Sequence, residues 1–88
     1  GHSSHIDTFG DFEVLRFSLD LSGRKKDSIK VKQLEREHDI RIIAFERKDS
    51  SASSIPSRES ILYQDDSVIA CVRNELVDAF TAEYIQHE

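Results

Sequence analysis

HDIRIIAFER, residues His38–Arg47, contains the most informative apolar segment of the chain. Its apolar residues predict a short strand that is covered on both faces and therefore lies centrally in a sheet; they are Ile40, Ile42, Ile43 and Phe45. The segment ends on Arg47, which places a positive charge at the carboxyl end of that strand. Around it, the order of helix, strand, loop with proline, acidic turn, strand and helix favours a small regulatory module over a catalytic one.

A helix is predicted immediately before this strand. Ser28 has the side chain of an N-cap, and the helix is expected to run from there to about Glu37. Val31, Leu34 and His38 recur at positions i, i+3 and i+7, so they should share the face that packs on the sheet.

Upstream of the helix, residues from Phe12 onward alternate between apolar and polar, which predicts a half-buried strand; its apolar members are Leu15, Phe17, Leu19 and Leu21. The basic run Arg24–Lys26 follows, and we interpret it as a solvated loop rather than a phosphate site. Residues 1–11 are polar and are expected to be a tag remnant and flexible leader, so that the domain itself spans residues 12–88.

The segment after Arg47 predicts a loop, a short strand and a turn. Residues 48–54 have the composition of a hairpin loop, and Pro56 belongs at a strand start or edge because it cannot donate a ladder hydrogen bond. An apolar patch at Ile61–Tyr63 precedes Asp65 and Asp66, which we interpret as turn residues rather than as a catalytic pair of carboxylates.

The last third of the sequence predicts one more strand and one more helix. Ser67–Arg73 is expected to form a second strand that is covered on both faces, and Asn74 to cap a helix whose apolar stripe is Leu76, Val77, Phe80 and Tyr84. The predicted fold is α+β, with the order β-α-β-β-β-α and helices packed on a small mixed sheet.

Length and composition narrow the classes of function. A chain of 88 residues forms one small domain with a thin core, and domains of this size often gain stability by pairing with another copy. The formal charge of −5 argues against a nucleic-acid partner. No apolar stretch approaches the roughly 20 residues that span a bilayer, and a single cysteine is compatible with a reducing compartment.

The sequence offers little for catalysis, and we expect no enzyme activity and no cofactor. Three glycines in the whole chain do not form a phosphate-binding loop motif. The histidines lack the spacing of a metal site, and His38 at a helix end is interpreted as structural. Cys71 lies inside VIACV and is expected to be a buried, inert thiol.

From about Phe12 to Tyr84, the order of motifs resembles the C-terminal domain of TrkA-type potassium-transport regulators, the RCK C-terminal domain. That family shows an opening strand and then a helix with two leucine-like residues three apart, which match Val31 and Leu34. An apolar strand that closes on arginine follows, and here it is Ile42–Arg47.

The resemblance continues through a loop with a proline, here Pro56, and a turn before the last strand and helix. Two positions depart from the family pattern. Ser28 stands where the family has a glycine before the first helix, and Asp65–Asp66 stands where it has a Gly-Asp turn.

In that family the domain is a dimer on the cytoplasmic side of a transporter or channel, and some members bind cyclic di-AMP between the two copies. Carried over by motif, the ligand-binding candidates in this chain are Ile42, Ile43, Arg47 and Pro56. Apolar walls would face the adenines, and Arg47 would bind a phosphate. The alternative for Arg47 is a salt bridge to a surface acid such as Glu46 or Asp49.

The resemblance thus implies a dimerising, ligand-sensing regulatory domain of a potassium or other cation transport protein. Its partners would be a second copy and a membrane transporter, channel subunit or fused membrane domain, and its location the cytoplasm at the inner face of the membrane. Cyclic di-AMP would be its effector. The alternative is a purely structural dimerisation module of a transporter or transcription regulator, with no small-molecule ligand.

Overall fold

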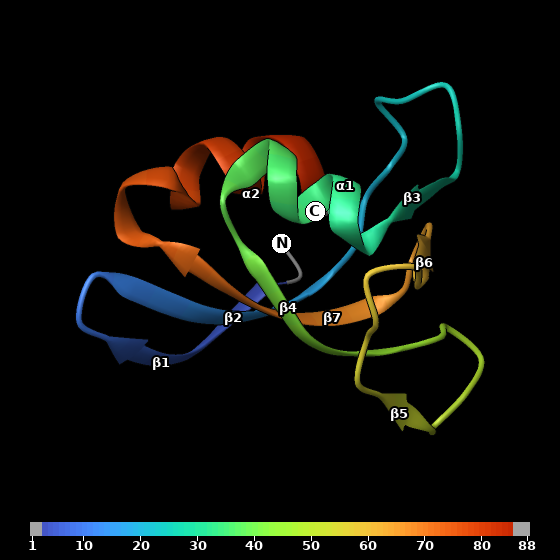
Figure 1. The fold of residues 1–88 in the computed structure, drawn as a ribbon, viewed down its shortest axis with the longest axis horizontal. Helices are drawn as coiled ribbons and strands as arrows, with labels where there is room; N and C mark the ends of the chain where they lie inside the picture. Colours follow the sequence, from blue (N-terminus) through green and yellow to red (C-terminus); the bar gives the residue numbers. More distant parts are fainter. Residues whose placement is uncertain (1–2, 86–88) are drawn as a thin grey trace.

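A five-stranded antiparallel sheet carries two helices in the computed structural model, which describes residues 3–85. The strands lie in the order β1-β2-β7-β4-β5, and β3 and β6 form a separate two-stranded ladder (Figure 1). The elements in chain order are β1 (Ser3–Phe9), β2 (Phe12–Ser18), β3 (Ser28–Lys30), α1 (Val31–His38), β4 (Arg41–Glu46), β5 (Ser53–Ser54), β6 (Ile61–Tyr63), β7 (Ser67–Arg73), the 3-10 turn η1 (Asn74–Leu76) and α2 (Val77–Tyr84).

The predicted α+β class and the six predicted elements are confirmed, as β2, α1, β4, β6, β7 and α2. Three further short or exposed strands, β1, β3 and β5, were not predicted. Within residues 3–85 every strand pair is antiparallel, so the expectation of a mixed sheet is wrong. No helix in that range is long and apolar enough to cross a membrane.

Where a flexible leader was expected, the structure has β1. Ser3–Phe9 pairs with β2 across a turn at Gly10, whose φ of +57° suits a residue without a side chain. Every residue of β1 is exposed, so the segment lacks the buried alternate positions by which a strand is recognised in a sequence. Gly1 and His2, the start of the expected tag remnant, lie outside the described residues.

The sheet is covered on one face only, because both helices lie on the same side of it (Figure 1). In β7, Val68, Ala70 and Val72 are fully buried while the alternate residues are half-buried. In β4, Ile42 is buried and its neighbour Ile43 is 45% exposed. The expectation that both strands are covered on both faces is therefore wrong: their continuous apolar runs hide an ordinary alternation.

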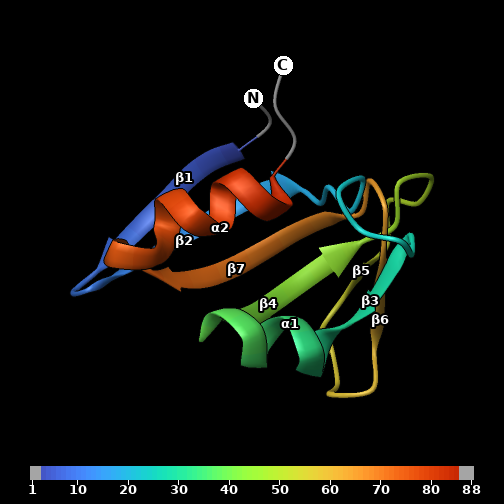
Figure 2. The ribbon, with the colours of Figure 1, turned by 90° about the horizontal axis from the view of Figure 1, so that it is seen from above.

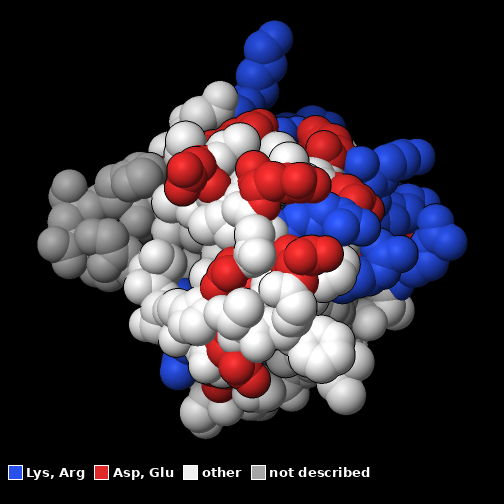
Figure 3. All heavy atoms as spheres, turned by 90° about the vertical axis from the view of Figure 1, so that its left-hand side faces the viewer, with Lys and Arg blue, Asp and Glu red and all other residues white. Residues whose placement is uncertain are grey.

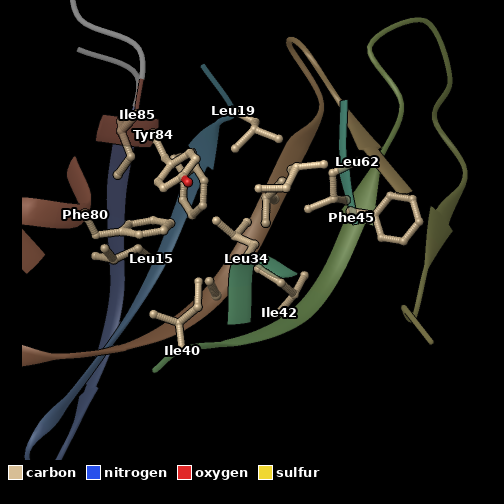
Figure 4. Packing of buried hydrophobic residues seen from close by; sticks show 14 of the residues in the cluster. Leu15, Leu19, Leu34, Ile40, Ile42, Phe45, Leu62, Phe80, Tyr84 and Ile85 are labelled. Carbon is tan, nitrogen blue, oxygen red and sulfur yellow. The ribbon is translucent and has the colours of Figure 1, made fainter. Parts of the chain in front are cut away.

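The core lies between this covered face and the helices. Leu34 of α1 and Phe80 and Tyr84 of α2 are fully buried and point into the same interior (Figure 4). Phe80 stands edge-on to Phe17, with ring centroids 5.3 Å apart. Burial of each such side chain stabilises the fold by roughly 1.5–3 kcal/mol. The predicted helix faces are confirmed.

His38 has the structural role that the sequence suggested. Its ring packs edge-on against the rings of Phe80 and Tyr84, at centroid distances of 5.6 and 5.0 Å. Its Nε2 lies 3.4 Å from a carboxylate oxygen of Glu83. The side chain thereby joins α1 to α2. Figure 2 shows both helices from above.

The predicted element boundaries need three corrections. Ser28 does not cap a helix but opens β3, because the buried Ile29 pairs with Leu62 of β6, and α1 begins at Val31. Asn74 starts a 3-10 turn, and its N–H donates to the carbonyl of Asp11 at 2.8 Å instead of capping α2.

The third correction concerns the first predicted strand, which ends earlier than its apolar pattern. β2 stops at Ser18, although Leu19 and Leu21 are both buried. Leu19 forms an isolated bridge with Ile85, and the N–H of Asp20 donates to the carbonyl of Tyr84 at 2.8 Å. These residues pair with the end of α2 rather than with the main sheet.

Candidate functional site

Arg47 lies where the large sheet meets the β3–β6 ladder. Its Nη1 donates to Oδ2 of Asp66 at 2.6 Å, and its Nη2 donates to the carbonyl of Ile61 at 2.9 Å. The guanidinium carbon is 4.9 Å from the ring centroids of both Phe45 and Tyr63. Cation–π contacts of this kind add to the ion pair. Arg47 therefore has a structural task at this junction.

Asp66 is the one buried charged residue of the described part of the chain, with 1% of its surface exposed. Besides the guanidinium of Arg47, its Oδ2 accepts a hydrogen bond from the N–H of Tyr63 at 2.8 Å. A carboxylate this deeply buried needs both partners, because removing one of them leaves an uncompensated charge. The salt bridge considered as the alternative role of Arg47 thus exists, with Asp66 rather than with Glu46 or Asp49.

Arg47 still has an accessible side, since its side chain is 42% exposed. It lines a shallow hollow of about 480 Å³ together with Arg16, Ser18, Glu46, Lys48, Ser50, Asp65 and Ser67. Lys48 in this hollow lies 3.6 Å from Asp65. The hollow mixes both signs of charge, and the charge of Arg47 is already offset by Asp66. A phosphate bound here would rely on Arg16 and Lys48 as well as on Arg47.

The other three predicted site residues do not share one surface. Ile42 is 6% exposed and belongs to the core beneath the helices. Ile43 lies on the opposite face of the sheet, at a register shift between Ile42 and Ala44. Pro56 is half-buried in the segment between β5 and β6. Of the four candidates, Ile43, Arg47 and Pro56 are each at least partly accessible, whereas Ile42 is buried.

The uncovered side of the sheet forms a second candidate surface, which we call the open sheet face. It consists of half-buried or exposed side chains from β2, β4 and β7, namely Val14, Arg16, Ile43, Glu46, Ile69 and Cys71. The register places Val14 beside Cys71 and Arg16 beside Ile69. A hollow of about 230 Å³ lies over this face, between Arg16, Ile69 and the start of β5.

Cys71 is part of the open sheet face, so the expectation of a fully buried thiol is wrong. It was missed for the same reason as Ile69: inside the run VIACV, every second residue faces away from the helices. The sequence signal for this face is Arg16, a charged residue in the alternating pattern of β2. The register of β2 and β7 then places Ile69 beside it. Asp66 was missed as a buried ion-pair partner because an acidic residue in a turn is usually exposed.

Among residues 3–85, the side chains that could bind a metal ion do not gather into a cluster. That range holds no group of three or more histidine, cysteine, aspartate or glutamate side chains arranged for a metal ion. It also holds no buried side-chain polar atom that lacks a hydrogen-bond partner. Comparison of the chain with protein-family models, with curated proteins and with solved structures finds no match.

Proposed function

We propose that this chain is a non-catalytic regulatory domain of a potassium or other cation transport protein, which dimerises and responds to a small effector. The observation that carries the proposal is the open sheet face, an apolar strip on the central strands of a domain with a thin core. A surface of this kind is typical of protein interaction sites. The resemblance of the motif order to the RCK C-terminal domain supports the regulatory role.

The contacts of Arg47 add support for that resemblance. Three of the motifs compared with that family are the arginine that closes a strand, the apolar patch before the turn, and the turn at Asp65–Asp66, which replaces the family's Gly-Asp. In this chain they meet, because Arg47 bonds the carbonyl of Ile61 and the carboxylate of Asp66. The motifs therefore belong to one packed unit rather than to unrelated segments of similar composition.

The proposed partner on the open sheet face is a second copy of the chain. A twofold interface brings the same surface together with itself, so its charges must be self-complementary. Arg16 and Glu46 line the same hollow as Ile69 and can supply such a pair across the axis. The domain would then sit in the cytoplasm at the inner face of the membrane, attached through its transporter.

The proposed effector is cyclic di-AMP, bound where the two copies meet. Ile43 offers apolar surface for an adenine, and Pro56 is partly accessible. The hollow beside Arg47 supplies the cations for phosphate, with Arg16 and Lys48 as its other basic residues. An effector that binds one arrangement of the dimer more tightly shifts the population toward it, and the attached transporter responds.

The alternative is a structural dimerisation module without a ligand. The engagement of Arg47 by Asp66 favours it, because a guanidinium that is already paired binds a phosphate less strongly. The dimer is common to both functions, and only the response to an effector separates them.

Dimerisation is tested by sedimentation equilibrium up to about 1 mM protein, the range of weak association. Two glutamates on the open sheet face, in the variant I43E/I69E, should convert the dimer to a monomer because like charges would face each other across the axis. Ile55→Glu is the matched control: Ile55 is 88% exposed but lies outside that face, so the dimer should persist. A wild-type monomer throughout this range would overturn the proposal.

Effector binding is tested by the melting temperature as cyclic di-AMP is added. Binding to the folded dimer stabilises it by about 2.7 kcal/mol at a concentration of 100 Kd. The variant R47A/D66N removes the guanidinium without leaving a buried charge, and it should reduce this shift. A flat response of the wild-type dimer would favour the structural module, and a shift unchanged in the variant would exclude Arg47 from the site.

A further inference from the structure

A basic cavity lies beside α1, and one of its lining residues, Arg41, is paired in register with Cys71 of the open sheet face. It has a volume of about 420 Å³ and is lined by Lys32, Glu35, Arg36, Asp39, Arg41 and Arg58. This size suits a small molecule. None of these residues lines the hollow beside Arg47 or the hollow over the open sheet face. Four cationic side chains around one cavity are unexpected in a chain of net charge −5.

Both carboxylates of the cavity accept a hydrogen bond, but only Asp39 is paired with a cation, so Glu35 keeps its negative charge in the cavity. Oε2 of Glu35 accepts a hydrogen bond from the N–H of Ile42 at 2.9 Å. Oδ2 of Asp39 lies 3.0 Å from Nε of Arg73, which donates to it from outside the cavity. Neither carboxylate forms an ion pair with a cation of the cavity within 4.0 Å among residues 3–85.

The three arginines, by contrast, have no carboxylate partner in residues 3–85. Nη1 of Arg41 donates to the carbonyl of Ile40 at 3.1 Å, a bond that leaves its charge uncompensated. Arg36 and Arg58 are exposed and form no side-chain hydrogen bond or ion pair with that part of the chain. Exposed arginines in a protein this acidic could readily pair with surface carboxylates. That these three converge unpaired on one cavity points to an anion from outside the chain.

Lys32, the fourth cation, is paired with Glu59 at 2.9 Å. The hydrogen bond and charge of Lys32, with the charge of Lys30, hold the pKa of the Glu59 carboxyl below its usual value. The region around the cavity thus already stabilises one negative charge. Figure 3 shows basic side chains gathered at one side of the molecule, while acidic side chains are dispersed over the rest of that view.

We propose that the cavity is a binding site for a small oligophosphate, either free or as the phosphate tail of a nucleotide. One guanidinium group can donate two parallel hydrogen bonds to the oxygens of a phosphate. Three guanidinium groups can therefore contact two or three adjoining phosphoryl groups. Three unpaired arginines and one uncompensated carboxylate, Glu35, leave an excess of two positive charges (3 − 1), which a monovalent carboxylate would not match. The site is separate from the effector site proposed above, and either can exist without the other.

A second basic hollow, at Arg24, Lys25 and Lys26, is the rival location. Its arginine is already engaged, since Nη1 of Arg24 donates to the hydroxyl of Tyr84 at 2.7 Å and lies 3.8 Å from Glu37. The two lysines remain as exposed point charges on a loop. This hollow therefore lacks the unpaired guanidinium groups that distinguish the cavity beside α1.

The test is calorimetric titration of the chain with sodium tripolyphosphate at low salt. We expect saturable binding that R36Q/R58Q weakens by about tenfold or more, because the variant removes two guanidinium groups and their charge-assisted hydrogen bonds to the phosphate. The control K25Q/K26Q removes the same formal charge from the rival hollow and should bind like the wild type. Circular dichroism verifies that both variants fold, as substitutions of exposed residues should.

Equal loss in both variants would mean attraction to net charge alone, and loss only in K25Q/K26Q would place the site in the rival hollow. Either result overturns the proposal, as does an absence of saturable binding. ATP and adenosine distinguish the two sources of the phosphate. ATP that binds as tightly as tripolyphosphate indicates phosphate recognition alone, whereas tighter ATP with detectable adenosine binding indicates a nucleotide.

Discussion

Asp65 has a left-handed backbone, with φ of 71°, at the turn between β6 and β7. This conformation costs an ordinary L-residue roughly 1–2 kcal/mol, and glycine adopts it without that cost. Asp65 therefore occupies a backbone position that favours glycine.

We expect Asp65→Ala to be less stable than Asp65→Gly by about 1 kcal/mol in urea unfolding. Both variants lose the same side-chain contacts of Asp65, including those with Lys48 and Gln64, so the difference between them isolates the backbone conformation. Equal stabilities would mean that the turn relaxes to an ordinary φ.

Sequence reasoning identified Arg47 as a special charge but did not find its partner. Nothing in the neighbourhood of either residue signals that Arg47 and Asp66, 19 positions apart, are in contact. The link depends on the pairing of β4 with β7, a long-range contact. Ile42 and Ile43 are both ligand-site candidates because the family motif carries both over, and the apolar run does not say which of the two faces the core.

At the scale of elements, the β1–β2 hairpin joins one exposed strand to one buried strand. Phe9 of β1 is 79% exposed, whereas Phe17 of β2 is 1% exposed. Hydrogen bonds to β2 hold β1 in place, and its side chains add little burial.

We therefore expect Phe9→Ala to change the free energy of unfolding by no more than about 0.5 kcal/mol. Phe17→Ala, in the same hairpin, should lower it by about 3–5 kcal/mol through the cavity it leaves. Chemical denaturation of dilute protein measures both values. A cost above about 1 kcal/mol for Phe9→Ala would contradict the exposure of β1.

The elements that were predicted are those with a strong apolar period, such as β2 and α1. The missed strands are short or lack that period: β5 consists of Ser53 and Ser54, and all of β1 is exposed. Ser28 illustrates why boundaries are difficult. Its local sequence favours a helix cap, but pairing of β3 with β6 decides its conformation, and that pairing is invisible before the chain folds.

At the scale of the molecule, Tyr84 connects α2 to the segment after β2. Burial raises the pKa of Tyr84 from 10.0 to about 12, the charge of Glu37 adds to the rise, and the charge of Arg24 opposes it. The folded state thus holds the phenol proton more tightly than the unfolded state. The resulting stability is complete below pH 10 and is lost as the pH rises from 10 through 12.

We expect the free energy of unfolding to fall across this pH interval, and Tyr84→Phe to remove most of that fall. Tyr63→Phe is the matched control, since Tyr63 is 43% exposed, and it should retain the fall. Urea titrations at several alkaline pH values measure the effect. A dependence on pH that is the same in both variants would assign it to other groups.

The sequence also could not predict that both helices lie on the same side of the sheet. Continuous apolar runs in β4 and β7 are typical of strands covered on both faces. In the described part of the chain, no element covers the second side of these strands, and that side forms the open sheet face. The same apolar run fits a strand that is covered on both sides and a strand that is covered on one side only. Only the packing in the structure distinguishes the two.

The guanidinium of Arg47 has a consequence for how the molecule melts. The β3–β6 ladder has three residues in each strand, too few to persist by itself. Arg47 ties Ile61 of that ladder and Asp66 before β7 to the end of β4. Neither sheet can therefore open without breaking the ion pair that compensates the buried carboxylate of Asp66. Loss of structure in the two sheets should therefore be a single all-or-none event, with one midpoint for every probe.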